Sequence, residues 1–162
     1  MIRIFSLLLI SLFVCSCVQN NVFDEYKVVP KVGWHKDSIK EFKLVNMDSL
    51  KEHNLFFNIR SSNSYPFSNL YIIGSLQFPN GKKIIDTLEY QMALPNGEWL
   101  GTGGVSIKEN KLWFKENFKF TEEGEYKISV SHAMRKNGST EGVSYLQGIK
   151  DVGFSVEFAE AH

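Results

Sequence analysis

The chain has 162 residues, with 18 lysines and arginines against 18 aspartates and glutamates, so its formal net charge is +0 at pH 7. This balance gives no electrostatic basis for binding nucleic acid, and we expect no nucleic-acid partner. Two cysteines exclude a disulfide-rich framework, whereas aromatic residues make up 14% of the chain and can supply a core. Length and composition indicate one folded domain.

The chain begins with the pattern of an exported lipoprotein. Arg3 is basic, and the apolar segment at residues 4–14 has the length of a signal-peptide core and is too short to span a bilayer. The segment leads to Ser16 and Cys17, and a small residue before a cysteine suits lipoprotein processing. We therefore predict a signal peptide at residues 1–16 and an acylated Cys17. Two or more acyl chains hold a protein firmly in a bilayer, because each buried methylene contributes about 0.8 kcal/mol.

Cys15 is the competing position for acylation. It follows a β-branched valine, which fits poorly into the small pocket of a signal peptidase, so Cys17 is favoured. A plain secretory signal cleaved near Gln19 is the remaining alternative. With cleavage before Cys17, residues 17–21 form a lipidated tether and residues 22–160 form the domain.

Apolar and polar residues then alternate along several segments, as in strands with one buried face. Residues 55–60 follow this pattern, and so do residues 70–78 and 83–91. The Asn-Gly pair within the intervening turn, residues 79–82, suits the two left-handed positions of a type I′ turn, so we predict a hairpin. On its second strand one face is expected to carry Ile84, Asp86, Leu88 and Tyr90.

The second half of the chain has the same character. Residues 111–120 and 125–133 are separated by a turn at Glu123-Gly124, which predicts a second hairpin. Residues 37–46 predict a further strand and residues 151–158 a final one. No helical stripe of comparable length is present. The sequence therefore predicts an all-β protein with an antiparallel β-sandwich, jelly-roll or immunoglobulin-like, as a single domain.

Residue types that perform catalysis are not arranged in a coherent set. The sequence has no metal-ligand spacing and no Gly-x-Ser-x-Gly turn that would expose a serine nucleophile. We interpret the histidines as structural or surface residues, and we expect no catalytic residue, metal or cofactor. They are His35, His53, His132 and His162.

A glycine-rich connection at residues 94–104 is the most suggestive candidate for function, because long loops in compact domains often carry it. It holds Glu98, Trp99 and Thr102, and Trp113 follows shortly after. We predict that these four residues belong to a loop that contacts a ligand or a partner, with the two tryptophans stacking on a glycan or a protein surface. The alternative is that Trp99 only closes one end of the sandwich.

Three short motifs consist of Asp, then Ser or Thr, then an aliphatic residue, and they resemble a bacterial periplasmic O-glycosylation sequon. They make Ser38, Ser49 and Thr87 candidate modification sites. The alternative is that they are ordinary turn and strand-entry sequences.

Motifs spread over nearly all of the predicted mature chain carry a resemblance to one family. Besides Cys17, they are Val22-Phe23-Asp24-Glu25-Tyr26, Trp34-His35-Lys36-Asp37-Ser38-Ile39, Tyr65-Pro66-Phe67-Ser68-Asn69-Leu70, Asp86-Thr87-Leu88-Glu89-Tyr90, Gly97-Glu98-Trp99-Leu100-Gly101-Thr102-Gly103, Asn110-Lys111-Leu112-Trp113-Phe114 and Ala133-Met134-Arg135. With these motifs the chain resembles the gliding motility lipoprotein family GldH.

The resemblance implies an envelope lipoprotein associated with the machinery that moves adhesins along the cell surface and is coupled to secretion. It implies no catalytic residue. The expected partners are the bilayer, through Cys17, and other gliding or secretion-associated envelope proteins. We expect a periplasm-facing protein, with the inner and outer membranes both left open. A glycan-binding lipoprotein that uses Trp99 and Trp113 is the alternative function.

Overall fold

The computed structural model describes residues 20–159, so the predicted signal peptide and Cys17 lie outside the described residues. Within the described range the protein is built from strands, and none of its elements is a helix that could cross a bilayer. The strands are β1 (Asn21–Val28), β2 (Trp34–His35), β3 (Lys40–Leu44), β4 (His53–Ser62), β5 (Asn69–Gln77), β6 (Lys83–Gln91), β7 (Ile107–Phe118), β8 (Tyr126–His132), β9 (Tyr145–Leu146) and β10 (Ile149–Phe158).

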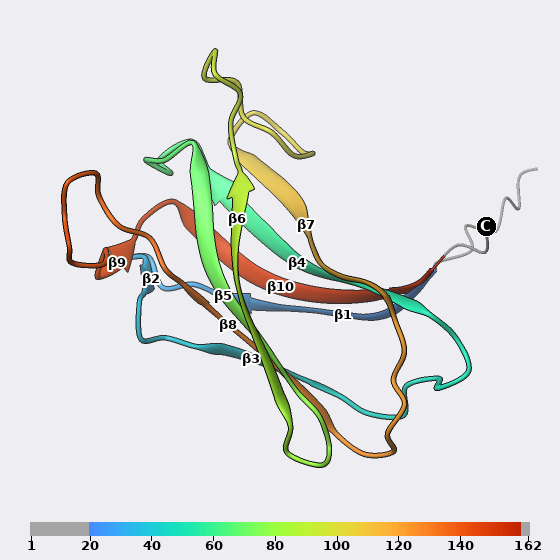
Figure 1. Cartoon of the computed structure of the whole chain (residues 1–162). Coiled ribbons are helices and arrows are strands. Elements are labelled where there is room, and N and C mark those ends of the chain that lie inside the picture. Colours follow the sequence, from blue (N-terminus) through green and yellow to red (C-terminus); the bar gives the residue numbers. More distant parts are fainter. Residues whose placement is uncertain (1–19, 160–162) are drawn as a thin grey trace, which may run out of the picture.

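Two four-stranded antiparallel sheets form the two layers of a sandwich (Figure 1). Sheet A has the order β1-β10-β4-β7, and sheet C has the order β3-β8-β5-β6. The short strands β2 and β9 pair with each other at one end and form the two-stranded sheet B. This confirms the predicted all-β sandwich. Apart from the β5–β6 hairpin, successive long strands alternate between the two sheets, as in a jelly roll.

The predicted second hairpin is wrong. β7 pairs with β4 in sheet A, whereas β8 pairs with β3 and β5 in sheet C. The turn signal at Glu123-Gly124 is real, since Gly124 has a φ of 127°, but the chain crosses there from one sheet to the other. Phe118, Phe120 and Tyr126 pack against one another at this crossing, with ring centroids of Phe120 and Tyr126 5.0 Å apart. Apolar packing thus links the two layers where sequence suggested a hairpin.

The hairpin between β5 and β6 is confirmed, but its predicted turn type is wrong. Gly81 has a φ of 90°, whereas Asn80 does not have the positive φ that a type I′ turn requires. Instead, the amide of Gly81 donates to the carbonyl of Phe78 at 2.9 Å and the amide of Phe78 donates to Lys82 at 2.8 Å. This is a three-residue loop with glycine in the left-handed position.

The alternation predicted from sequence determines which side chains enter the core. Leu55, Phe57 and Ile59 of β4 are fully buried between the sheets. On β6 the side chains at alternate positions point inward, as predicted, and the Nζ of Lys115 on β7 approaches the Oδ2 of Asp86 within 2.6 Å. This ion pair joins the edge strands of the two sheets and closes one side of the sandwich.

The connections between strands fall into two groups at opposite ends of the sandwich (Figure 1). We call one end the terminal end, because β1 starts and β10 finishes there. The strand registers place the connections 45–52, 78–82 and 119–125 at the same end. The opposite end carries the longer connections, and we call it the loop end. Its connections are residues 29–39, 63–68, 92–106 and 133–148.

Candidate functional site

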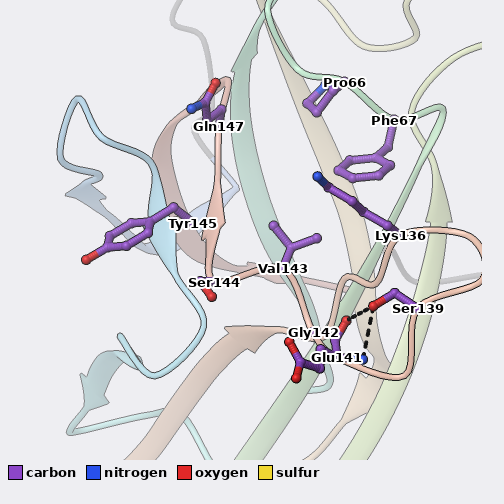
Figure 2. Close-up of a pocket in the computed structure, with 10 residues that line it drawn as sticks. All are labelled: Pro66, Phe67, Lys136, Ser139, Glu141, Gly142, Val143, Ser144, Tyr145 and Gln147. Atoms are coloured by element: carbon purple, nitrogen blue, oxygen red, sulfur yellow. Dashed lines mark hydrogen bonds between the residues drawn. The ribbon is translucent and has the colours of Figure 1, made fainter.

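The loop end contains an open pocket of about 660 Å³ between two connections that are distant in sequence (Figure 2). Pro66 and Phe67 line one side, and residues of the segment 136–147 line the other. Figure 2 shows the ring of Phe67 and the side chain of Val143 at the pocket, while the ring of Tyr145 points away from Phe67. Sequence reasoning missed this site, because no local pattern relates residue 67 to residue 143.

The segment that lines the pocket is held by backbone pairing on both sides. The amide of Val143 donates to the carbonyl of Met134 at 2.8 Å, and Arg135 and Gly142 form an isolated antiparallel bridge. Farther along, Tyr145 pairs with His35 and its ring packs edge-on against the imidazole, with centroids 4.7 Å apart. These contacts hold the pocket-lining segment against the sandwich.

The paired strands β2 and β9 are fixed to the core by the buried side chain of Trp34 in β2. The side chain of Trp34 is fully buried, and its indole Nε1 donates to the carbonyl of Ser38 at 2.8 Å. The ring nitrogen Nε2 of His132 lies 2.9 Å from the carbonyl oxygen of Trp34. Burial lowers the pKa of His132, which favours the neutral ring with Nε2 donating to that carbonyl.

The pocket is lined by both apolar and charged side chains. Phe67 and Val143 supply apolar surface, and Lys136 and Glu141 supply one charge of each sign. The hydroxyl of Ser139 donates to the carbonyl of Glu141 at 3.2 Å and accepts from the amide of Glu141 at 3.1 Å, which holds it in a turn.

Three of the four predicted loop residues lie at the loop end. Glu98 is exposed, and Trp99 is half-buried against Tyr65, with ring centroids 6.2 Å apart. Thr102 pairs with Glu109 at the start of β7 through backbone hydrogen bonds of 2.9 and 2.8 Å. The indole of Trp99 therefore packs over the end of the core, the geometry expected of a residue that closes the sandwich.

Trp113 does not join the other three residues. It lies on the outward face of β7, 51% exposed, and its ring packs on that of Phe56 with centroids 4.4 Å apart. It lines a separate cleft of about 420 Å³ near the terminal end of sheet A, and Asn20 and Phe158 line the same cleft. The structure thus separates the two tryptophans that the glycan hypothesis combined.

A polar cluster on the outer face of sheet A was also missed. The carboxylate of Glu109 accepts hydrogen bonds from the Tyr26 hydroxyl at 2.9 Å and from Arg60 Nε at 2.6 Å, and the guanidinium of Arg60 lies over the Tyr26 ring. Burial raises the pKa of Glu109, but these hydrogen bonds outweigh it and the pKa is lowered. Asp24 lies nearby on the same face of sheet A, and partial burial together with the negative charge of Glu109 raises its pKa. Period-two alternation placed Arg60 outward but could not pair it with Glu109.

The candidate modification sites differ in accessibility. Ser49 is exposed in the connection 45–52, and Thr87 is exposed on the outer face of β6. Ser38 is only partly exposed, in a turn where its amide donates to the carbonyl of His35. Among residues 20–159, no group of three or more metal-ligating side chains could hold an ion.

A family model described as GldH lipoprotein matches residues 21–156, which is nearly the whole of the described sandwich. The chain belongs to the GldH lipoprotein family. GldH-family membership confirms the resemblance found in the sequence and identifies the chain as a gliding motility lipoprotein, which is associated with the cell envelope.

Two relatives support this assignment over most of their length. The "Gliding motility lipoprotein GldH homolog" of Christiangramia forsetii is 53% identical over 156 residues, which cover 96% of this chain and 93% of the relative. The "Gliding motility lipoprotein GldH" of Flavobacterium johnsoniae is 48% identical over 151 residues, which cover 93% of both chains.

Solved structures resemble this GldH-family chain only weakly. A structure of the Gx strain of infectious bursal disease virus has a TM-score of 0.33 and 10% identity, covering 87% of this chain. A structure of the Gt strain has a TM-score of 0.26 and 12% identity, covering 86% of this chain. The chain spans about a third of those viral chains, 33% and 34%.

Proposed function

We propose that this GldH-family chain is a lipid-anchored, non-enzymatic component of the gliding machinery that acts through protein contacts made at its loop end. The observation that carries the proposal is the separation of the two ends. The longer connections and the pocket beside Phe67 lie at the loop end, and the start of β1 and the finish of β10 lie at the other. A protein tethered at one end presents the opposite end to its neighbours.

The proposed anchor is acylated Cys17, after removal of residues 1–16, with residues 17–21 as tether and residues 22–160 as domain. The short polar sequence after Cys17 lacks an acidic or lysine-rich cue, which supports a periplasm-facing protein. Mass spectrometry of the amino-terminal peptide tests acylation directly, and Cys17→Ala should release the protein from membranes. Retention of the alanine variant in membranes would contradict the anchor.

Photocrosslinking in gliding cells tests the contact surface. A benzophenone amino acid at Tyr145, which is 46% exposed at the loop end, should produce a discrete crosslinked species containing another envelope protein of the gliding machinery. The matched control is Ile85, which is 63% exposed on the edge strand β6. Equal crosslinking at both positions, or crosslinking only at Ile85, would overturn the assignment of the loop end.

A second candidate function is glycan binding, and the cleft around Trp113 favours it. The exposed indole offers a flat apolar face, and Asn54, Glu116 and Asn117 line the same cleft with groups that hydrogen-bond hydroxyls. Trp99 takes no part in this version, because it packs at the loop end. A glycan array with the purified domain and its Trp113→Ala variant tests the idea, and binding that survives the substitution would rule out this cleft.

A further inference from the structure

We propose that the terminal end of the sandwich rests on the bilayer that holds the protein's own lipid anchor, with the side chain of Leu50 inserted among the lipids. This inference rests on the proposed acylation of Cys17. It adds an orientation and a membrane-contact residue, both of which follow from the terminal end of the fold.

The first argument is the reach of the tether. Three residue steps separate Cys17 from Asn20, and three residues can span at most about 11 Å even when fully extended. Asn20 is fixed to the sandwich, because its carbonyl accepts a hydrogen bond of 3.2 Å from the amide of Phe158 at the end of β10. An acyl anchor on residue 17 therefore keeps the start of β1 close to the membrane surface.

The second argument is that the connection 45–52 is fixed beside this attachment point. The carbonyl of Glu52 accepts a hydrogen bond of 2.9 Å from the amide of Ala159, one residue beyond the bond to Asn20. The ammonium of Lys51 lies 4.2 Å from the centroid of the Phe158 ring. The connection 45–52 is therefore attached to the same strand end as Asn20 and cannot move away independently.

The third argument is the chemistry of this connection. Leu50 is 90% exposed, and its amide is held by the carboxylate of Asp48 at 3.0 Å, so the side chain is presented on an ordered turn. Val45, at 54% exposure, adds apolar surface in the same connection. Apolar side chains that enter the headgroup boundary strengthen the attachment of interfacial proteins.

The charges around Leu50 are balanced. Asp48 pairs with Lys51 at 3.7 Å, and Glu52 pairs with Lys119 at 3.1 Å. These two pairs are neutral, but the connections 45–52, 78–82 and 119–125 together carry five acidic and three basic residues. The contact therefore gains nothing from attraction to anionic lipids and depends on the acyl anchor and on apolar insertion. A glycan on Ser49 would hold the neighbouring Leu50 away from the lipids, so the inference excludes modification at Ser49 and leaves Ser38 and Thr87 as candidates.

Fluorescence depth measurement on the full lipoprotein tests the orientation. The predicted mature chain has no other free thiol, so Leu50→Cys and Val105→Cys variants can each carry a single environment-sensitive fluorophore. Val105 is the matched control, because it is 88% exposed but lies at the loop end. Each labelled protein is reconstituted into phosphatidylethanolamine and phosphatidylglycerol vesicles with or without brominated acyl chains.

We expect the fluorophore at position 50 to shift to the blue and lose emission with brominated lipid, and the fluorophore at position 105 to change in neither respect. Equal responses at the two positions, in vesicles that carry the protein, would overturn the orientation while leaving the anchor intact. Protein that fails to float with vesicles would overturn the anchor and the orientation together. As a second variant, Leu50→Asp should reduce the quenching of a fluorophore at Val45→Cys, and unchanged quenching there would argue against insertion of Leu50.

Discussion

Gly74 of β5 lies against the ring of Phe57 of β4 so closely that a Cβ at position 74 would be 2.9 Å from Phe57 Cε2. The same Cβ would lie 2.9 Å from Cε2 of Phe114 on β7. These two rings pack on each other with centroids 4.7 Å apart in the middle of the core. Because glycine has no side chain, both rings of sheet A can pack against the backbone of sheet C.

Gly74→Ala should therefore destabilise the domain by about 1–3 kcal/mol, because overpacking forces the buried rings from their positions. Urea denaturation followed by circular dichroism measures the change. Gly104→Ala is the control, since a Cβ there would meet nothing within 4 Å, and it should change stability by less than about 0.5 kcal/mol. Equal effects of the two substitutions would contradict the packing account.

Two buried histidines should make the domain sensitive to acid. His53 is fully buried between Phe120 and Phe158, and neither of its ring nitrogens has a hydrogen-bond partner in the described residues. Burial lowers the pKa of His53, and burial likewise lowers the pKa of His132. In the unfolded chain both rings would titrate near pH 6.5, so below about that pH the unfolded state binds more protons.

The contribution of the two neutral histidines to the free energy of unfolding should thus be complete above about pH 6.5 and should fall as the pH drops below that value. Urea denaturation at a series of pH values from about 7.5 to about 5, in steps of roughly half a unit, measures how the free energy of unfolding changes with pH. His53→Phe keeps an aromatic ring between the same two neighbours and should flatten the acid slope. If a variant with phenylalanine at both positions kept the slope, other groups would have to be responsible.

The parts of the fold that follow from nearest neighbours in sequence were predictable. The alternation at residues 55–60 and 83–91 is a local property, and it identified the core-facing residues of β4 and β6 correctly. It did not predict that Phe56 and Asn58, on the other face of β4, are buried as well. The hairpin of β5 and β6 followed because both strands flank one short turn. Even there the turn type depended on the φ of Asn80, which an Asn-Gly pair alone does not fix.

Partners that lie far apart along the chain were not predictable. A turn after β7 is compatible both with a hairpin and with a crossing between the two sheets. The structure has the crossing, and Phe118 and Phe120 pack against each other there, at the end of the sandwich. The relative placement of the candidate loop residues was not predictable for the same reason. Trp99 and Trp113 are close in sequence, yet Gly101 and Thr102 turn the chain onto β7 and leave the two rings in different places.

Substitution of the two tryptophans should separate closure of the sandwich from surface contact. Trp99 packs against the buried ring of Tyr65, and its replacement by alanine should cost about 1–3 kcal/mol of stability. Trp113 is half-exposed and mainly contacts Phe56, so Trp113→Ala should cost only about 0.5–1.5 kcal/mol. Urea midpoints at constant m-value measure both, and a larger loss for Trp113 would contradict these roles.

The cluster of Tyr26, Arg60 and Glu109 should contribute stability that depends on pH. The hydrogen bonds from Arg60 and Tyr26 lower the pKa of Glu109 in spite of its burial. A lowered pKa means that the pair stabilises the fold above the unfolded value of about 4.3 and that this stabilisation is lost as the pH falls through the folded value.

A double-mutant cycle with Arg60→Gln and Glu109→Gln isolates this pair. Both side chains are more than a third exposed, 39% and 37%, so water screens the attraction and the coupling energy at pH 7 should be about 0.5–1 kcal/mol. The coupling should shrink as the pH falls through the lowered pKa of Glu109, because a protonated Glu109 no longer attracts the guanidinium. Glu109 lies near the start of β7, where its backbone pairs with that of Thr102. A coupling that stayed constant with pH would therefore mean that the substitutions act through the backbone of this junction instead of through charge.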